Sequence, residues 1–203
     1  MQDDFENLSQ SLIERKGTRT KRAIIAVVSV LLVVILAVTA ALIVKTYVIS
    51  SFIVEGTSMY PTLDGGSGAI QDSNAFNGEI LYLNKLAKIK RGDIIVFTPD
   101  WIENSDGSYK SLVKRVIAVA GDHLQIIENA VYLNGDLINE PYVNEAMDGN
   151  QNSEWWINDG EIFVMGDNRN NSSDSRIYGP ALLKSVVGKC FLIKGLDGKL
   201  RTP

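Results

Sequence analysis

The apolar residues of this chain form one long run near the N-terminus and a series of short runs after it. Positions 23–44 carry no charged side chain, and only Ser29 and Thr39 among them are not apolar. As a helix rising about 1.5 Å per residue, this run is about 33 Å long, which is enough to cross a hydrocarbon core of about 30 Å. The pattern predicts one membrane-spanning helix.

The charges around the run predict its orientation. Five basic residues lie at positions 15, 16, 19, 21 and 22, whereas only Lys45 follows closely. The positive-inside rule therefore places the N-terminus in the cytoplasm. A cleaved signal peptide is the alternative, but its apolar part spans about 7–15 residues and ends at a small-x-small site, which is absent here. We expect a short, mobile cytoplasmic tail at 1–22, an uncleaved anchor at 23–44 and an extracytoplasmic domain at 45–203.

Beyond the anchor, short stretches rich in β-branched residues alternate with turn residues, and no convincing amphipathic helix occurs. Tight turns are expected at Asn134-Gly135 and Asp122-His123. This spacing predicts a mainly β domain, an antiparallel folded or barrel-like sheet. The stretches are 47–54, 79–83, 93–98, 112–120, 124–127, 130–133, 161–165 and 186–193, and polar connections are expected at 64–78, 99–110 and 145–159.

The last of these connections carries Trp155-Trp156. The pair is interpreted as a local hydrophobic anchor for a long loop. Contact with lipid headgroups is the alternative, because tryptophan favours the membrane interface.

Composition narrows the possible chemistry. The 203 residues hold 24 acidic and 20 basic side chains, and the part from residue 46 onward carries a formal charge of −6. That balance gives no indication of a nucleic-acid partner. One cysteine, Cys190, excludes an intramolecular disulfide and a Cys-rich metal site, and one histidine, His123, excludes a multi-histidine zinc site. We expect neither a metal nor a cofactor.

These two residues are also weak candidates for catalysis. His123 falls in a predicted turn without a serine nearby, and Cys190 lies in an apolar run that favours a small core residue. A serine with a lysine base remains. An exposed lysine, with a pKa of about 10.4, is protonated, whereas burial lowers its pKa and makes it competent as a base.

The apolar run 112–119 supplies such a lysine, Lys114. Side chains alternate across a strand, so Lys114 and Arg115 face opposite sides. An edge strand with both charges in solvent is the alternative. The candidate serine is Ser58, where Gly56 permits a sharp bend and Pro61 stiffens the exit. Because Ser58 follows the anchor by only 14 residues, its hydroxyl is expected close to the membrane surface.

Three segments together resemble the signature boxes of the type I signal peptidases. They are SMYPTL at 58–63, KRVIAVAGD at 114–122 and GDNRNNSSDSR at 166–176, and GDIIVF at 92–97 matches a structural box. Their order and spacing fit over about 45–193. The resemblance implies a β-rich catalytic core with a smaller inserted cap, here about 123–160. The single span resembles the Gram-positive members.

The resemblance also implies a Ser-Lys mechanism. Ser58 would attack the scissile carbonyl with its own N–H in the oxyanion hole, and neutral Lys114 would serve as the general base. Ser172 matches a serine that hydrogen-bonds and orients the lysine. A second oxyanion donor, a serine in many relatives, is replaced by Gly56, and about a dozen polar residues are inserted within 64–78.

Further residues are matched or suggested by position. The resemblance pairs Asp174 with Arg176 near the site and makes Asp167 and Arg115 supports of the core. The candidate apolar wall residues for substrate are Val54, Met59, Leu63 and Val113.

The implied substrates are exported preproteins with small-x-small cleavage sites, cut at the outer face of the plasma membrane. The lipid bilayer is the other expected partner. An extended substrate presents alternate side chains to one wall, which accounts for that spacing. A signal-peptidase-like factor without catalysis, assembling surface proteins or pili, is the alternative. The membrane anchor disfavours a soluble repressor-type Ser-Lys protease. Lys114 disfavours the signal peptidases of the endoplasmic reticulum, which have a histidine at this position.

Overall fold

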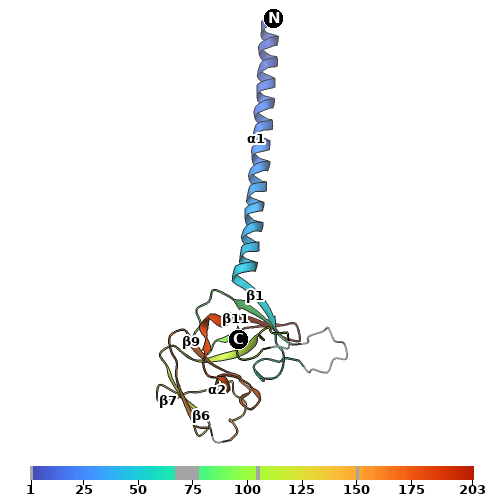
Figure 1. Cartoon of the computed structure of the whole chain (residues 1–203). Coiled ribbons are helices and arrows are strands. Elements are labelled where there is room, and N and C mark those ends of the chain that lie inside the picture. The colour runs from blue at the N-terminus through green and yellow to red at the C-terminus, as the bar shows by residue number, and fades with distance from the viewer. Residues whose placement is uncertain (1, 67–77, 104–105, 150) are drawn as a thin grey trace. The chain divides into compact units, whose positions relative to one another are not determined.

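The computed structural model describes residues 2–66, 78–103, 106–149 and 151–203. The chain divides into two units, one ending at Tyr47 and the other comprising Val48–Pro203 (Figure 1). Eleven residues of the predicted 64–78 insertion, 67–77, lie outside the described residues.

The first unit is helical. Helix α1 (Gln2–Ile43) continues into a π-helical turn, η1 (Val44–Val48). Within the described residues, Ile25–Val48 is one helix long and apolar enough to cross a membrane. The helix also includes residues 2–22, the stretch expected to be a cytoplasmic tail. Residues 2–22 hold no proline and several good helix formers, so nothing local ends the helix there.

The second unit contains two antiparallel sheets. The larger sheet has eight strands in the order β1-β2-β11-β3-β4-β9-β10, with β12 paired to β11. Register shifts in the β4–β9 and β11 pairings mark bulges, which bend and twist strands. The strands are β1 (Ile49–Ile53), β2 (Ile80–Asn84), β3 (Ile94–Phe97), β4 (Leu112–Val119), β9 (Glu161–Met165), β10 (Ala181–Leu182), β11 (Val186–Lys194) and β12 (Leu200–Arg201).

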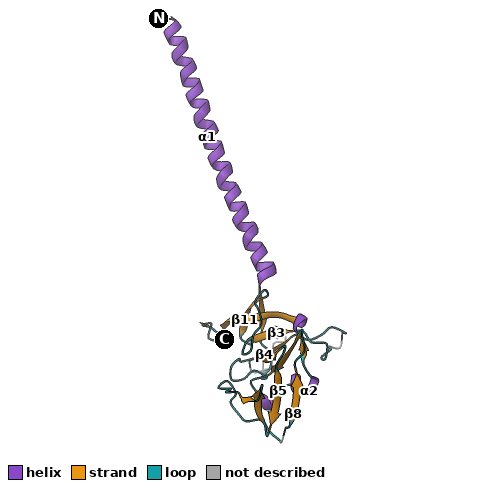
Figure 2. Ribbon diagram, turned by 90° about the vertical axis from the view of Figure 1, so that its left-hand side faces the viewer, coloured by secondary structure: helices purple, strands orange, loops and turns teal. Residues whose placement is uncertain are grey.

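The smaller sheet lies within the stretch assigned to the inserted cap, and Figure 2 shows β5 and β8 side by side in it. The turn at Asn134-Gly135 is confirmed, with both residues at positive φ (55° and 91°), the conformation that asparagine and glycine tolerate best. The other turn falls two residues earlier than predicted, at Ala120-Gly121 instead of Asp122-His123, and His123 already belongs to β5. The strands, in the order β7-β6-β5-β8, are β5 (His123–Ile127), β6 (Ala130–Leu133), β7 (Asp136–Leu137) and β8 (Ser153–Trp156).

Each predicted stretch coincides with one strand to within a few residues at either end, so the mainly β, folded antiparallel class is confirmed. The expected loop at 145–159 was wrong in part, because β8 pairs there with β5. Because β8 has only four residues and is flanked by polar ones, its local sequence gives little indication of a strand. The other elements without a prediction are also short: β7, β10, β12, α2 (Ser175–Tyr178), η2 (Arg169–Asn171) and η3 (Leu183–Ser185).

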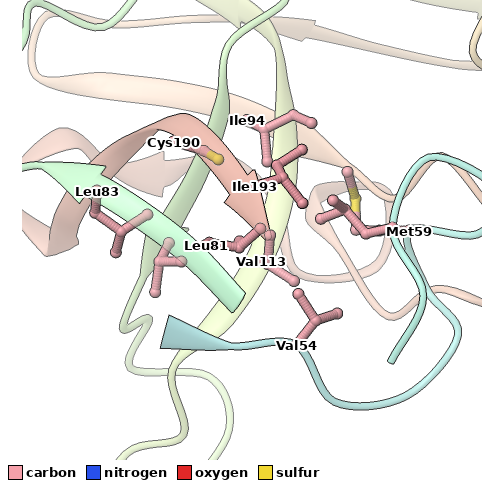
Figure 3. Close-up of a cluster of buried hydrophobic side chains, with 10 residues drawn as sticks. Val54, Met59, Leu81, Leu83, Ile94, Val113, Cys190 and Ile193 are labelled. Atoms are coloured by element: carbon pink, nitrogen blue, oxygen red, sulfur yellow. The ribbon is translucent and has the colours of Figure 1, made fainter. Parts of the chain in front are cut away.

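Three hydrophobic clusters form the core of the second unit. One joins β1, β2, β3, β4 and β11 with the turn that follows β1, and Figure 3 shows its side chains converging. A second lies between the two sheets around Phe163 and Leu124, and a third around Phe97 and Val164. The candidate wall residues Val54, Met59, Leu63 and Val113 all belong to the first cluster and are buried.

Candidate active site

The larger sheet and the turn after β1 bring Ser58 and Lys114 together. The Lys114 Nζ donates a hydrogen bond of 2.7 Å to the Ser58 Oγ across 56 residues of chain. Strand β4 supplies the lysine, paired with Ile95 of β3, and Lys114 is only 3% exposed. The alternative of an edge strand with solvated charges was therefore wrong, because β4 lies between β3 and β9.

Burial sets the ionisation of this lysine. Desolvation is the main cause that lowers the pKa of Lys114, from 10.5 to about 8. The positive charges of Arg176 and Lys110 lower it further, while the carboxylates of Asp174 and Asp167 act in the opposite direction. A substantial neutral fraction is thus available near neutral pH, and neutral lysine accepts a proton from a hydroxyl.

The loop after β9 holds the serine turn from one side. The Asn168 backbone N–H donates to the Ser58 carbonyl at 3.0 Å, and the Asn168 side chain donates to the Thr57 carbonyl at 3.1 Å. A side chain at Gly166 has no room, because its Cβ would lie 2.3 Å from the Ser172 Oγ and 2.4 Å from the Ser58 carbonyl oxygen. The glycine that opens the GDNR segment is therefore required by close packing against the serine turn.

Two buried ion pairs stabilise this loop. Arg115 forms a two-point contact with Asp167, with N–O distances of 2.8 and 2.6 Å, and Arg176 likewise contacts Asp174 at 2.9 Å. Burial raises the pKa of Asp174, but the hydrogen bonds and charge of Arg176 and the Gly166 N–H outweigh that effect and hold the pKa below its usual 3.8. Asp174 also caps α2 by accepting from the Arg176 N–H.

Ser58 and Lys114 border one cleft of about 400 Å³. Of the candidate wall residues, only Val113 lines it, whereas Val54, Met59 and Leu63 are packed in the core behind. Sequence analysis did not identify most of the cleft residues, since nothing local distinguishes them from an ordinary loop and strand. Besides Ser58, Val113 and Lys114, the lining comprises Phe52, Glu55, Tyr109, Lys110, Ser111 and Leu112.

Known proteins resemble this chain in sequence. The family model described as "Signal peptidase, peptidase S26" matches residues 26–194. The chain belongs to this family. It is 32% identical over 180 residues to Signal peptidase I of Bacillus licheniformis, covering 81% of this chain and 84% of that protein. It is 33% identical over 156 residues to Signal peptidase I T of Bacillus subtilis (strain 168), covering 70% and 72%.

A solved structure is also similar to this member of the signal peptidase family. It is the crystal structure of a signal peptidase I from Enterococcus faecalis V583, 28% identical in sequence with a TM-score of 0.42. The match covers 51% of this chain and 97% of that chain.

The position of Ser172 in this family member differs from the prediction. Its Oγ is buried and forms no hydrogen bond to Lys114 among the described residues; the hydroxyl is instead near the Asp174 carboxylate, whose pKa it helps to lower. The reason is local: Ser172 ends η2 in an extended conformation, and its hydroxyl occupies the space beside Gly166. Gly56 adopts φ 74° and pairs with Gly65 across an isolated bridge, a conformation and an approach that suit glycine.

The sequence of this family member did not predict a further set of contacts around Arg115 and the loop after β9. Arg169 is buried and contacts the Glu140 carboxylate at 2.5 and 2.8 Å, and the Tyr142 ring lies 3.9 Å below the Arg115 guanidinium. These residues brace Arg115 and the loop that touches the serine turn. Glu140-Pro141-Tyr142 resembles an ordinary turn in sequence, so only the fold identifies it.

The single histidine and the tryptophan pair lie in the smaller sheet. His123 stacks on Trp156 at 4.0 Å and contacts the Glu154 carboxylate at 3.1 Å. Trp155 packs on Phe163 at 4.7 Å, as a hydrophobic anchor does, whereas Trp156 is 67% exposed. Cys190 is buried in the core, and burial raises the pKa of its thiol to about 11, which keeps it protonated.

Proposed function

We propose that this chain is a membrane-anchored serine endopeptidase that removes signal peptides from exported preproteins. The observation that carries the proposal is the 2.7 Å contact between Ser58 and a buried Lys114 with a pKa of about 8, in a member of the signal peptidase family. A hydroxyl nucleophile needs an adjacent base with a usable neutral fraction at working pH, and a lysine with a pKa of about 8 supplies one.

The proposed reaction has two stages. Ser58 Oγ attacks the scissile carbonyl carbon while Lys114 takes its proton, and the Ser58 backbone N–H stabilises the oxyanion. Lys114 then gives the proton to the leaving amine, the C–N bond breaks, and an ester to Ser58 remains. Lys114 next takes a proton from water, whose hydroxide attacks the ester. The signal peptide leaves with a free carboxylate, and Ser58 regains its proton.

The remaining predicted residues have supporting roles in this proposal. Asp167 and Arg115 fix the strand and the loop on either side of Lys114, and Asp174 with Arg176 fixes the loop against the serine turn. Three of these charges also act on the base, because Asp174 and Asp167 raise and Arg176 lowers the pKa of Lys114. We assign Ser172 to packing beside Gly166, and the second oxyanion donor at Gly56 is limited to backbone groups.

The proposed substrates are preproteins with small residues at the first and third positions before the cleaved bond. An extended peptide in the cleft presents alternate side chains to the wall formed by Val113, above the buried Val54, Met59 and Leu63. Small side chains suit a wall that is already filled by core residues. The anchor, with its N-terminus in the cytoplasm, would hold the domain at the outer face of the membrane where such preproteins emerge.

The test uses the full-length protein in detergent micelles with a purified preprotein. Ser58→Ala and Lys114→Ala are each expected to lose at least about a thousandfold in kcat, because nucleophile and base act as a unit. Ser108→Ala and Lys184→Ala, at exposed positions outside the cleft, serve as matched controls. Full activity in either site variant would overturn the mechanism. Tight preprotein binding by the wild type without any cleavage would favour the alternative, a non-catalytic assembly factor.

A further inference from the structure

One residue, Glu79, holds both ends of the segment that carries Ser58. At the start of the segment, the Val54 N–H donates to the Glu79 carbonyl at 2.9 Å. At its end, the Glu79 N–H donates to the Asp64 carbonyl at 2.9 Å, and the Asp64 N–H donates to the Glu79 Oε2 at 3.1 Å. The serine turn is therefore a loop closed at its base by the backbone and the carboxylate of Glu79.

This carboxylate has a dedicated partner near the C-terminus. Glu79 is only 7% exposed, and Arg201 of β12 contacts both of its oxygens, at 2.7 and 2.8 Å. The same guanidinium donates to the Thr62 carbonyl at 2.8 Å, within the serine segment itself. A planar guanidinium can satisfy these acceptors together, which a lysine ammonium at the end of a flexible chain does less well. Arg201 lies outside the residues 26–194 that match the family model.

The backbone at this base is packed without spare room. A Cβ at Gly78 would lie 1.7 Å from the Val54 carbonyl oxygen, and a Cβ at Gly65 would lie 2.0 Å from the Gly56 carbonyl oxygen. Glu79 follows Gly78 directly, so a displacement of Glu79 moves groups in direct contact with residues 54–56. Ser58 lies only two residues further along the chain.

We infer that Glu79 and Arg201 are positioning residues for the nucleophile, since they fix the turn that places the Ser58 hydroxyl against Lys114. The inference rests on the proposed function, in which Ser58 attacks the substrate. Loss of the guanidinium leaves a buried carboxylate unpaired and frees the Thr62 carbonyl, which loosens the turn. Most of the cleft lining, Tyr109–Lys114, comes from another part of the chain and keeps its place, although Glu55 belongs to the loosened segment, so KM is expected to change much less than kcat.

The predicted signature is a fall in kcat with KM nearly unchanged. A misplacement of about 1 Å in a reacting group costs about a hundredfold in rate, so we expect Arg201→Gln to lower kcat by about ten- to a hundredfold. Arg201→Lys keeps the charge and is expected to recover part of that loss. The double variant Glu79→Gln/Arg201→Gln removes the unpaired charge and is expected to be no slower than Arg201→Gln alone.

The experiment measures kcat and KM of the full-length variants in detergent micelles with a synthetic Ala-x-Ala peptide. Thermal unfolding followed by circular dichroism identifies a temperature at which every variant is folded, and the kinetics are measured at that temperature. Lys199→Gln is the matched control, because Lys199 neighbours Arg201 but its ammonium forms an ion pair with exposed Asp197, at 3.2 Å, and not with Glu79. The control should match the wild type.

Each result has one meaning. A wild-type kcat in Arg201→Gln, or a loss confined to KM, overturns the positioning role. A loss that follows only the unfolded fraction of each variant also overturns it, because the pair is then merely structural. If Ser58→Ala retains activity, the proposed function itself fails. If Ser58→Ala is inactive while Arg201→Gln is normal, only the positioning role fails.

Discussion

The ionisation of Lys114 gives the most direct test of the reasoning, because it links burial to rate. We expect kcat/KM of the full-length protein to rise about tenfold per pH unit up to about pH 8 and to level off above it. The cause is the depressed pKa of Lys114, which falls from 10.5 to about 8 mainly through desolvation. Protonated lysine cannot accept the Ser58 proton, so the rate follows the neutral fraction.

The size of the effect comes from the same pKa values. At pH 7, a base with a pKa of about 8 is about one-tenth neutral, whereas one with a pKa of 10.5 is neutral in about one molecule in 3,000. Burial of Lys114 thus raises the reactive fraction at neutral pH by about 300-fold. A site that leaves Lys114 in water would forfeit this factor.

The assay is peptide cleavage in detergent micelles across about pH 5–11, at substrate concentrations well below KM. Under these conditions the profile reports the free enzyme. Short incubations followed by return to pH 8 check that the protein survives each pH. A rate that still rises past about pH 10 would refute the argument, because it would show a lysine with an ordinary pKa. A profile flat through pH 8 would refute Lys114 as the base.

Three further predictions concern the same site. Lys114→Met should raise the free energy of unfolding by about 3 kcal/mol near pH 7, because the wild-type lysine is protonated more easily in the unfolded state than in its buried site. This advantage of the variant should shrink between about pH 8 and 10.5. Denaturant titrations that show a pH-independent difference in stability would contradict it. Lys110→Gln removes a positive charge that lowers the pKa of Lys114, so the midpoint of the pH–rate profile should move to higher pH. A midpoint at lower pH would contradict that sign. Gly166→Ala should lower kcat by about a hundredfold, because its Cβ would lie 2.4 Å from the Ser58 carbonyl oxygen; a normal kcat would mean that the turn yields without moving the nucleophile.

Much of the fold was predictable from local patterns. Strands such as β6 and β9 have the bounds that β-branched residues and flanking turns indicate, and Asn134-Gly135 forms the expected turn. β8 and β12 escaped prediction because their order comes from neighbouring strands rather than from their own sequence. In residues 2–22 the local sequence does contain good helix formers, and α1 includes this stretch although its polar composition gave no indication of a helix.

The apolar segment, the mainly β class and the two groups proposed for the chemistry, Ser58 and Lys114, can all be read from the order of residues. Such properties are carried by neighbouring residues: an uncharged run, an alternation of side chains, and short motifs in a fixed order. How these groups meet depends on the folded chain. The fold places the Lys114 Nζ 2.7 Å from the Ser58 Oγ, turns the Ser172 hydroxyl toward Gly166, and joins Arg201 to Glu79 across 122 residues. Burial and pairing of this kind depend on long-range packing, which no local pattern in the sequence records.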